Sequence, residues 1–420
     1  MSRILLATFG SLGDLHPSLA VGRAIVARGH QAVIATSIEY REAVEAAGLA
    51  FVPLRPSIES LGERRAVTKR LMHPLRGAER LLRDYVFPSL DDSLADLTAA
   101  APGIDLFVSH PLTCAVPIVA QAQGRPWMST VLAPQGILSK QAPPRIAGFN
   151  VLQIGQRLGP RVYDIAWNGM RRALRRWEQP LRAFRAAHGL PDTGQVMMME
   201  GQYSPHGTLA LFDAVLATPR SDWPEPLTPC GAPLFDGQTP AAAELERLHR
   251  FLDDGDAPLV FALGSAAVWI AERYWQHAIA AAQALGRRAI LLTGEGTSLR
   301  TPPGICAMPY MPYSQVFPRA AAVIHQAGIG TLSQALRAGR PQLITPVAFD
   351  QPDNAERAVR LGVARVLPFQ KVTAKRMAVQ LDALLKDARQ AEAARALAQQ
   401  LRDVDGAGVA ADALIRKARE

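Results

Sequence analysis

The residues best suited to chemistry lie in one short loop at 325–331, with the sequence HQAGIGT. The loop directly follows the apolar run AAVI and opens a helical pattern, TLSQALRAG. Small residues let another group approach the backbone closely, and the free N–H groups at a helix start attract anions. The loop therefore predicts a diphosphate cradle, with a glycine turn for close strand–helix packing as the structural alternative.

The cradle differs from two common phosphate-binding motifs. No Lys follows Gly330, so the pattern GxxxxGK[ST] of nucleotide triphosphatases is absent. The glycine spacing also differs from GxGxxG, and no acidic residue stands about 20 residues further on after a second strand.

A second polar pair, Asp350 and Gln351, follows the next predicted strand, at the same sheet edge as His325. A carboxylate beside an amide can hydrogen-bond several sugar hydroxyls. Taken without its context, the run FDQPDN would instead be a helix N-cap.

The elements that must position these residues alternate in two halves. In the first half, strands are predicted at 3–8, 31–36, 50–53, 105–109, 126–131 and 208–217, with a helix at 17–28 that begins at Pro17. In the second half, strands are predicted at 258–263, 288–293, 305–308, 321–324, 342–345 and 364–367. This alternation is typical of α/β proteins with two doubly wound, Rossmann-like parallel sheets.

Pro and Gly cluster between the halves, which marks a linker at 219–240. The sequence thus predicts an N-terminal domain over 1–218 and a C-terminal domain over 241–400, facing each other across a cleft. A last helix over 401–420 is expected to pack back on the N-terminal domain.

Composition excludes several classes of protein. With 420 residues, 49% hydrophobic and 20% charged, the chain is neither collagen, coiled coil nor wholly disordered. Three cysteines, far apart, predict no disulfide framework and no zinc site. No signal peptide and no transmembrane run of 18 residues is visible, which favours the cytoplasm.

The net charge of +9 fits three kinds of partner: nucleic acid, an anionic membrane surface or an anionic small substrate. The basic residues are scattered, and no nucleic-acid-binding module is visible. The basic helix around 171–185 is a solvated face or a peripheral contact with acidic lipid.

The run over 310–354 combines YMPY, HQAGIGT, ALRAGRPQL and DQPDN, and it resembles the donor signature of family 1 glycosyltransferases with the GT-B fold. FGSLGDLHPSLAVGRAIVARGH, SDWPEPL, GAPLFDG and PLVFALGS resemble the bacterial and sterol-glycosyltransferase branch, including the rhamnosyltransferase of rhamnolipid synthesis. The resemblance covers nearly the whole chain and is weak over 60–100 and 136–205.

For the donor, the resemblance implies a nucleotide-diphosphate sugar. Its diphosphate would contact His325 and the backbone N–H groups of Gly328, Gly330 and Thr331, although Ala327 replaces a frequent glycine. Other donor contacts would come from these residues: Ser265 for the diphosphate, Asp350 and Gln351 for the sugar, and Tyr310, Met311 and Tyr313 for the nucleobase. Core or turn roles are the alternatives for His325 and Ser265.

For catalysis, the resemblance implies inverting transfer to an acceptor hydroxyl, and a base that removes the hydroxyl proton. Asp14 is the first candidate base and His16 the second, since imidazole is better matched to neutral pH. Capping of the first helix is the structural alternative for Asp14. His110 could assist, or it is an ordinary loop histidine.

The acceptor site is expected from the weakly matching insertions, where 197–199 and Phe149 could line an apolar pocket or simply belong to the core. The predicted reaction moves rhamnose or glucose from a dTDP- or UDP-sugar to a hydrophobic, lipid-like or aromatic acceptor, with no metal and no other cofactor. Two alternatives stay open: a nucleotide-sugar epimerase and a non-enzymatic basic protein that binds nucleic acid.

Overall fold

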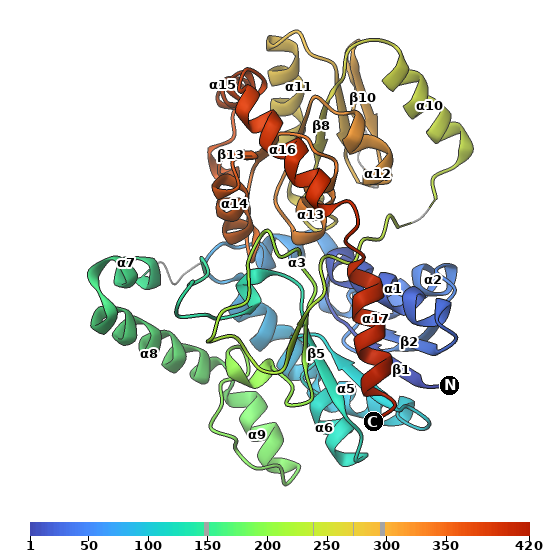
Figure 1. Cartoon of the computed structure of the whole chain (residues 1–420), viewed down its shortest axis with the longest axis vertical. Helices are drawn as coiled ribbons and strands as arrows, with labels where there is room; N and C mark the ends of the chain where they lie inside the picture. Colours follow the sequence, from blue (N-terminus) through green and yellow to red (C-terminus); the bar gives the residue numbers. More distant parts are fainter. Residues whose placement is uncertain (147–150, 238, 272, 295–298) are drawn as a thin grey trace. The chain divides into compact units, whose positions relative to one another are not determined.

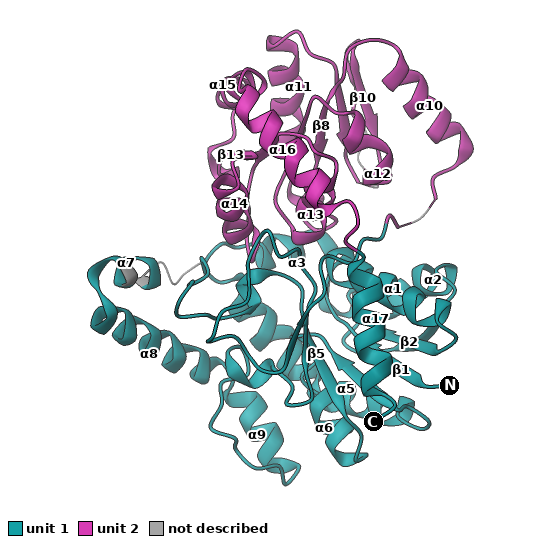
Figure 2. Ribbon diagram, viewed as in Figure 1, with its two compact units in different colours: residues 1–235, 405–420 teal, residues 236–404 magenta. Residues whose placement is uncertain are grey.

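The computed structural model describes residues 1–146, 151–237, 239–271, 273–294 and 299–420, which form two compact units (Figures 1 and 2). Unit 1 comprises residues 1–235 and 405–420, and unit 2 comprises residues 236–404. Each unit is a parallel sheet with helices, so the predicted α/β class with two Rossmann-like sheets is confirmed.

Unit 1 contains a seven-stranded sheet with the order β3-β2-β1-β4-β5-β6-β7. Its strands are β1 (Arg3–Ala7), β2 (Gln31–Thr36), β3 (Ala50–Pro53), β4 (Leu106–Ser109), β5 (Trp127–Val131), β6 (Thr208–Ala210) and β7 (Leu227–Pro229). Its α-helices are α1 (Leu12–Ala27), α2 (Arg41–Ala46), α3 (Arg64–Leu71), α4 (Gly77–Arg80), α5 (Leu90–Ala100), α6 (Val116–Ala122), α7 (Val151–Leu158), α8 (Pro160–Trp177), α9 (Gln179–Ala187) and α17 (Gly406–Lys417).

Unit 2 contains a six-stranded sheet with the order β10-β9-β8-β11-β12-β13. Its strands are β8 (Leu259–Ala262), β9 (Ala289–Leu292), β10 (Ile305–Met308), β11 (Ala322–His325), β12 (Gln342–Ile344) and β13 (Ala364–Val366). Its α-helices are α10 (Ala242–Asp253), α11 (Tyr274–Ala284), α12 (Tyr313–Val316), α13 (Ile329–Arg337), α14 (Gln351–Arg360), α15 (Ala374–Leu385) and α16 (Ala388–Leu401).

Strand β1 shows why the sheet of unit 1 needs helices on both faces. Ile4 and Leu6 join a core cluster with side chains of α1 and α17, whereas Leu5 and Ala7 join a separate cluster with α5 and α6. Successive side chains of a strand point to opposite faces, so a continuous apolar run is buried only between two layers of helices.

The start of α1 differs from the prediction. The helix begins at Leu12 with Ser11 as its N-cap, and Pro17 lies inside it. A capping box formed by Ser11 and Asp14 closes the first turn, which sets the start of the helix more strongly than the proline does.

The predicted linker is also corrected in part. Residues 227–229 form β7, which pairs with β6 at the edge of the first sheet, and unit 1 continues to Phe235. Proline is tolerated on an edge strand because its missing N–H faces away from the ladder, so a Pro-rich run need not be a linker. The strand predicted at 208–217 is shorter and ends at Ala210.

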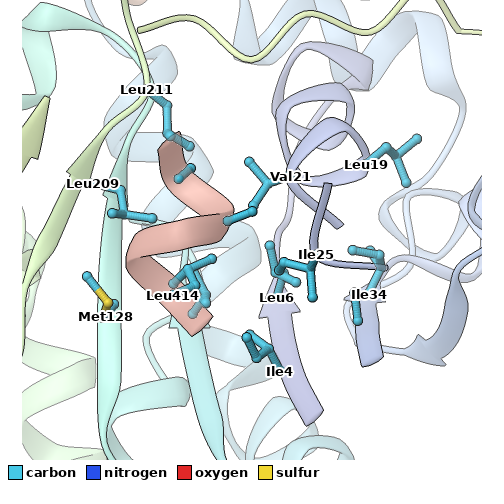
Figure 3. Packing of buried hydrophobic residues seen from close by; sticks show 14 of the residues in the cluster. Ile4, Leu6, Leu19, Val21, Ile25, Ile34, Met128, Leu209, Leu211 and Leu414 are labelled. Carbon is cyan, nitrogen blue, oxygen red and sulfur yellow. The ribbon is translucent and has the colours of Figure 1, made fainter. Parts of the chain in front are cut away.

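The C-terminal helix α17 belongs to unit 1, where it lies along α1 (Figure 1). Leu414 is fully buried in the cluster that also holds Val21, Leu209 and Leu211 (Figure 3). Gly406 makes the close approach possible, since a Cβ there would lie 2.5 Å from the carbonyl oxygen of Gly231. The last residues of the chain therefore complete the core of the first unit.

We predict that Leu414→Ala lowers the free energy of unfolding of unit 1 by about 2–5 kcal/mol, because the substitution leaves a cavity in a close-packed core. Urea denaturation followed by circular dichroism measures the change. Val409→Ala is the matched control, since Val409 lies on the same helix with 42% of its surface exposed. Equal effects of the two substitutions would contradict the role assigned to α17.

Candidate active site

Both sheets reverse their strand order beside their first strand, and most of the predicted site residues gather at these two reversals. In unit 1, β1 lies between β2 and β4, and in unit 2, β8 lies between β9 and β11. Loops leave the two strands of such a pair in opposite directions, which opens a ligand-binding crevice at the carboxyl edge of the sheet.

At the reversal in unit 1, Asp14 and His110 lie together. Asp14 follows β1, His110 follows β4, and Oδ1 of Asp14 is 3.4 Å from Nε2 of His110. The other carboxylate oxygen, Oδ2, accepts hydrogen bonds from Ser11 N at 2.7 Å and from Ser11 Oγ at 3.1 Å. The Asp14 side chain keeps 30% of its surface exposed, against 8% for His110. Asp14 thus serves as a capping residue and still presents a carboxylate edge to solvent.

A backbone hydrogen bond determines which nitrogen of the His110 ring carries the proton. The N–H of Leu112 donates to Nδ1 of His110 at 3.2 Å, so Nδ1 is the acceptor of a neutral ring. The proton of that ring is then on Nε2, which lies 3.4 Å from Oδ1 of Asp14. His110 therefore borders the carboxylate from the buried side.

Gly10 makes room for this arrangement. Its φ of +139° is a conformation that side chains rarely adopt, and a Cβ there would lie 2.3 Å from Oδ2 of Asp14. The hydroxyl of Tyr40 donates to the carbonyl oxygen of Gly10 at 3.1 Å, which fixes the turn from below. Glycine is therefore required at position 10, because a side chain there would collide with the Asp14 carboxylate.

His16, the second candidate base, does not join this pair. Its ring packs against Phe235, with 5.2 Å between the ring centroids. Two residues along a helix correspond to roughly 200° of rotation, so His16 and Asp14 leave α1 on different sides. The structure separates the two candidates and brings only Asp14 to His110.

At the reversal in unit 2, helix α13 begins with its first turn uncapped by any side chain. Gly328 is the N-cap residue and makes no side-chain capping bond, and Gly330 in the first turn is exposed. The N–H groups of this turn and the positive end of the helix dipole suit an anion. Thr331 is buried and its side chain is hydrogen-bonded to Tyr313, so Thr331 offers mainly its backbone.

The phosphate contact predicted for the ring of His325 is corrected. The side chain is 0% exposed, Nε2 lies 2.8 Å from Oε1 of Gln342, and Nδ1 accepts from the N–H of Ala327 at 3.1 Å. Burial lowers the pKa of His325 to about 4, so the ring is neutral and donates to Gln342. The ring points into the core because His325 ends the central strand β11. It stabilises the loop by accepting the hydrogen bond from Ala327 N.

The loops after β11 and β12 are both strained and tied together. Ala327 has φ +68° and Phe349 has φ +56°, a left-handed conformation that favours glycine. Asn354 donates from Nδ2 to the carbonyl oxygen of Ala327 at 2.9 Å and to Oδ2 of Asp350 at 2.7 Å. One buried amide therefore fixes the cradle and the carboxylate predicted to bind the sugar.

Asp350 and Gln351 play different parts. Asp350 is half-buried at the N-cap of α14, where its carboxylate is held by Asn354. Gln351 is buried, and its Oε1 accepts hydrogen bonds from Val347 N at 2.8 Å and Ala348 N at 3.3 Å. The carboxylate of Asp350 is therefore partly open to solvent, while the carbonyl of Gln351 shapes the loop that carries it.

Two family models match the chain. Residues 4–97 match the glycosyltransferase family 28 N-terminal domain, and residues 289–410 match the C-terminal domain of the erythromycin biosynthesis protein CIII-like family. The chain is 31% identical over 415 residues to the O-mycaminosyltylonolide 6-deoxyallosyltransferase of Streptomyces fradiae, covering 94% of this chain and 93% of that protein. This chain belongs to the family 1 glycosyltransferases of the GT-B fold.

Other relatives and solved structures agree with this assignment. The glycosyltransferase is 32% identical to GtfE of Amycolatopsis orientalis, over 86% of this chain and 85% of that protein. It shares the fold of the spinosyn forosaminyltransferase SpnP, with a TM-score of 0.70, 18% identity and full coverage of both chains. The glycosyltransferase VinC, solved with dTDP, has a TM-score of 0.67 and 21% identity over 99% of both chains. Membership of this family supports neither the epimerase nor the nucleic-acid-binding alternative.

The segment predicted to hold the nucleobase follows β10 of the glycosyltransferase. Tyr310 is half-buried, and burial together with the charge of Asp236 raises its pKa, so it is a neutral phenol. Tyr313 stacks on Phe317 with 4.3 Å between ring centroids. The side chain of Met311 is 1% exposed and belongs to the core, so only its backbone is placed to meet a base, and that contact stays a prediction.

The residues expected to form the acceptor pocket are mostly structural. Met197 and Met198 donate their backbone N–H groups to the carboxylate of Glu178, at 2.9 and 2.8 Å, and their side chains border core clusters. Met199 is 2% exposed and lies in the core. Phe149 lies outside the described residues.

The sequence analysis did not single out Gln326, which lies between the two loops expected to meet the donor. Its side chain is 96% buried, and its Oε1 has no hydrogen-bond partner. Its Nε2 lies 2.2 Å from the position that a Cβ on Gly264 would take, and 3.1 Å from that of a Cβ on Gly328. The amide thus fills the space between the loops after β8 and β11, beside Ser265. A polar residue between two glycine-containing strand ends was the only available signal in the sequence.

The described residues hold no group of three or more His, Cys, Asp or Glu side chains arranged to bind a metal ion. None of their helices is both long and apolar enough to cross a membrane.

We predict that His325→Ala lowers the free energy of unfolding of the glycosyltransferase by about 2–4 kcal/mol, because Gln342 and Ala327 N lose their partners inside the core. Urea denaturation measures this change, and the exposed His249→Ala on α10 is the control. Weakened nucleotide binding with unchanged stability would instead restore direct contact between the ring and phosphate.

We predict that His325→Ala also weakens the dependence of the free energy of unfolding on pH. The unfolded histidine, with an ordinary pKa near 6.5, binds a proton that folded His325 refuses down to a pH of about 4. Stability of the natural chain therefore falls as the pH drops from about 6.5 to 4, by at most about 1.4 kcal/mol per pH unit from this residue. The His325→Ala variant lacks this contribution, so its free energy of unfolding should fall less over the same pH range.

Proposed function

We propose that this glycosyltransferase moves a hexose, rhamnose or glucose, from a dTDP- or UDP-sugar to a hydroxyl of a hydrophobic acceptor, with inversion at the anomeric carbon. The observation that carries the proposal is the Asp14 carboxylate at the reversal of the first sheet, half-open to solvent and backed by His110 at 3.4 Å. A base in that position suits direct attack by an acceptor oxygen.

In the proposed reaction, Asp14 accepts the proton of the acceptor hydroxyl as that oxygen forms its bond to the anomeric carbon. The bond between the anomeric carbon and the diphosphate oxygen breaks, and its electron pair leaves with the nucleotide diphosphate. An ordinary carboxylate is a weak base for an alcohol, so proton transfer accompanies the attack. His110 acts as a positioning residue, because it touches Asp14 from the buried side and is itself 8% exposed.

The leaving diphosphate would be stabilised by the start of α13. The loops at 263–266, 325–331 and 346–351 contain no lysine or arginine, so in this proposal backbone N–H groups and the helix dipole supply the positive potential. Ser265 adds a hydroxyl beside Gly264. This arrangement needs no metal ion, and metal independence is part of the proposal.

The sugar and the nucleobase would bind on either side of this helix start. Asp350 is held by Asn354 in a position to accept hydrogen bonds from sugar hydroxyls. Tyr310 offers a half-buried aromatic ring on which a pyrimidine can stack. The structure solved with dTDP, VinC, supports a nucleoside diphosphate as the leaving group.

The names of the relatives support a hydrophobic acceptor. They include the vancomycin aglycone glucosyltransferase of Amycolatopsis orientalis, 30% identical to this chain, and the sterol 3-beta-glucosyltransferase UGT80A2 of Arabidopsis thaliana, 24% identical. The first name specifies an aglycone as acceptor, and the second specifies a sterol, which is hydrophobic. A lipid-like acceptor, as the resemblance to rhamnolipid synthesis implies, is of the same chemical class.

We predict that Asp14→Asn reduces kcat by a factor of about 10²–10⁴, with little change in the Kd of the nucleotide diphosphate. Asparagine can still accept the hydrogen bond from Ser11 N, so the variant separates catalysis from helix capping. Asp91→Asn is the control, because Asp91 also lies in the first turn of a helix of unit 1 and is 84% exposed. Turnover near that of the natural chain would exclude Asp14 as the base.

A thermal-shift panel tests the donor. We expect dTDP, UDP and their sugar conjugates to raise the melting temperature, and mononucleotides without a diphosphate to raise it much less, because a ligand that binds only the native state stabilises it. Preference for dTDP over UDP favours a rhamnosyl donor. The absence of any shift with all nucleoside diphosphates would overturn the donor assignment.

A further inference from the structure

The helical hairpin of α7 and α8 carries an unusual concentration of exposed apolar side chains. Ile154 and Leu158 on α7 are 56% and 66% exposed, and Val162 and Ile165 on α8 are 39% and 73% exposed. These four large hydrophobic residues lie within twelve positions around the turn at Gly159, whose φ is +110°. The opposite face of α8 is buried, since Tyr163, Ala166, Met170 and Leu174 share one core cluster. The exposed side chains are therefore not needed to fold the hairpin.

The hairpin is also strongly basic. Residues 151–177 contain six arginines and one acidic residue, a net charge of +5. Within the described part of the chain, no ion pair engages Arg157, Arg161, Arg172 or Arg176. Unpaired positive charge beside exposed apolar surface points to a partner that is both anionic and apolar.

The two properties share one face of α8. At about 100° per residue, Val162, Ile165, Arg172 and Arg176 fall within about 80° of one another around the helix axis. The apolar pair lies near the turn at Gly159, and the arginine pair lies further along the helix. All four side chains are exposed. The two helices stand out from the sheet of unit 1 (Figure 1).

We propose that the α7–α8 hairpin docks the enzyme on an anionic lipid bilayer. Ile154, Leu158, Val162 and Ile165 would enter the boundary between headgroups and acyl chains, and the arginines would bind lipid phosphates. Amphipathic helices with basic residues beside an apolar face bind membrane surfaces in this way, and arginine pairs with phosphate in a bidentate manner. This surface would bring the enzyme to a lipid-like acceptor, yet its docking does not depend on the proposed reaction.

A second copy of the chain fits the hairpin less well. Two hairpins of net charge +5 would face each other in a symmetric dimer, and like charges brought together in an interface are unfavourable. An anionic bilayer satisfies the charge and the apolar side chains at the same time.

Co-sedimentation of the full chain with vesicles tests the proposal. We expect binding to vesicles of phosphatidylcholine with phosphatidylglycerol, at least about tenfold weaker binding to pure phosphatidylcholine, and release at high salt. Leu158→Ser with Ile165→Ser, and separately Arg172→Gln with Arg176→Gln, should each reduce binding to the anionic vesicles about tenfold.

Matched controls exclude general changes of hydrophobicity and charge. Val379→Ser with Val409→Ser removes two exposed apolar side chains elsewhere, and Arg389→Gln with Arg402→Gln removes two exposed arginines from unit 2. These controls should bind the anionic vesicles like the natural chain. All variants should keep turnover with a water-soluble acceptor, which separates docking from the proposed reaction.

Several outcomes would overturn the proposal. They are failure to bind either kind of vesicle, equal binding to both kinds, and equal losses in the hairpin variants and their controls. A molecular mass in solution that falls from dimer to monomer in the hairpin variants would assign the surface to a second copy instead. A raised KM for the water-soluble acceptor would assign it to the acceptor site.

Discussion

The site depends on one constraint of parallel sheets: the loops that leave adjacent strands diverge only where the strand order reverses. Each unit has one such reversal beside its first strand, between β1 and β4 and between β8 and β11. Asp14 and His110 stand at the first, and Gln326 and the start of α13 stand at the second. Side chains far apart in the sequence meet there because hydrogen-bonded register aligns the ends of the strands, as the pairing of Ala7 with Ser109 shows.

Buried polar groups give these loops their shape. His325 braces the backbone at Ala327 from below, Asn354 links that backbone to Asp350, and Ser11 holds one oxygen of Asp14. Left-handed backbone at Ala327 and Phe349 is costly for side chains, and these hydrogen bonds fix it in the folded state. The residues expected to meet ligands are therefore mostly backbone or half-exposed groups, and the fully buried polar residues behind them act indirectly.

The basic residues are concentrated away from the loops that are expected to meet the donor. The loops at 263–266, 325–331 and 346–351, which are expected to meet the donor, contain no lysine or arginine, while eight arginines lie in residues 151–187 of unit 1. A helix start binds a diphosphate at short range and with defined geometry, whereas arginines on long side chains suit a diffuse anionic surface. The excess of basic residues in the composition therefore says little about the donor.

The sequence by itself determined the two parallel sheets, the positions of nearly all their strands and the two loops at 10–14 and 325–331, because apolar periodicity and glycine patterns are local signals. The tertiary structure decided the rest. It paired Asp14 with His110, turned His16 toward Phe235, buried His325 and Met311, and made part of a proline-rich run an edge strand. Which way a side chain faces depends on strands and helices that are distant in the sequence, and no local pattern encodes those neighbours.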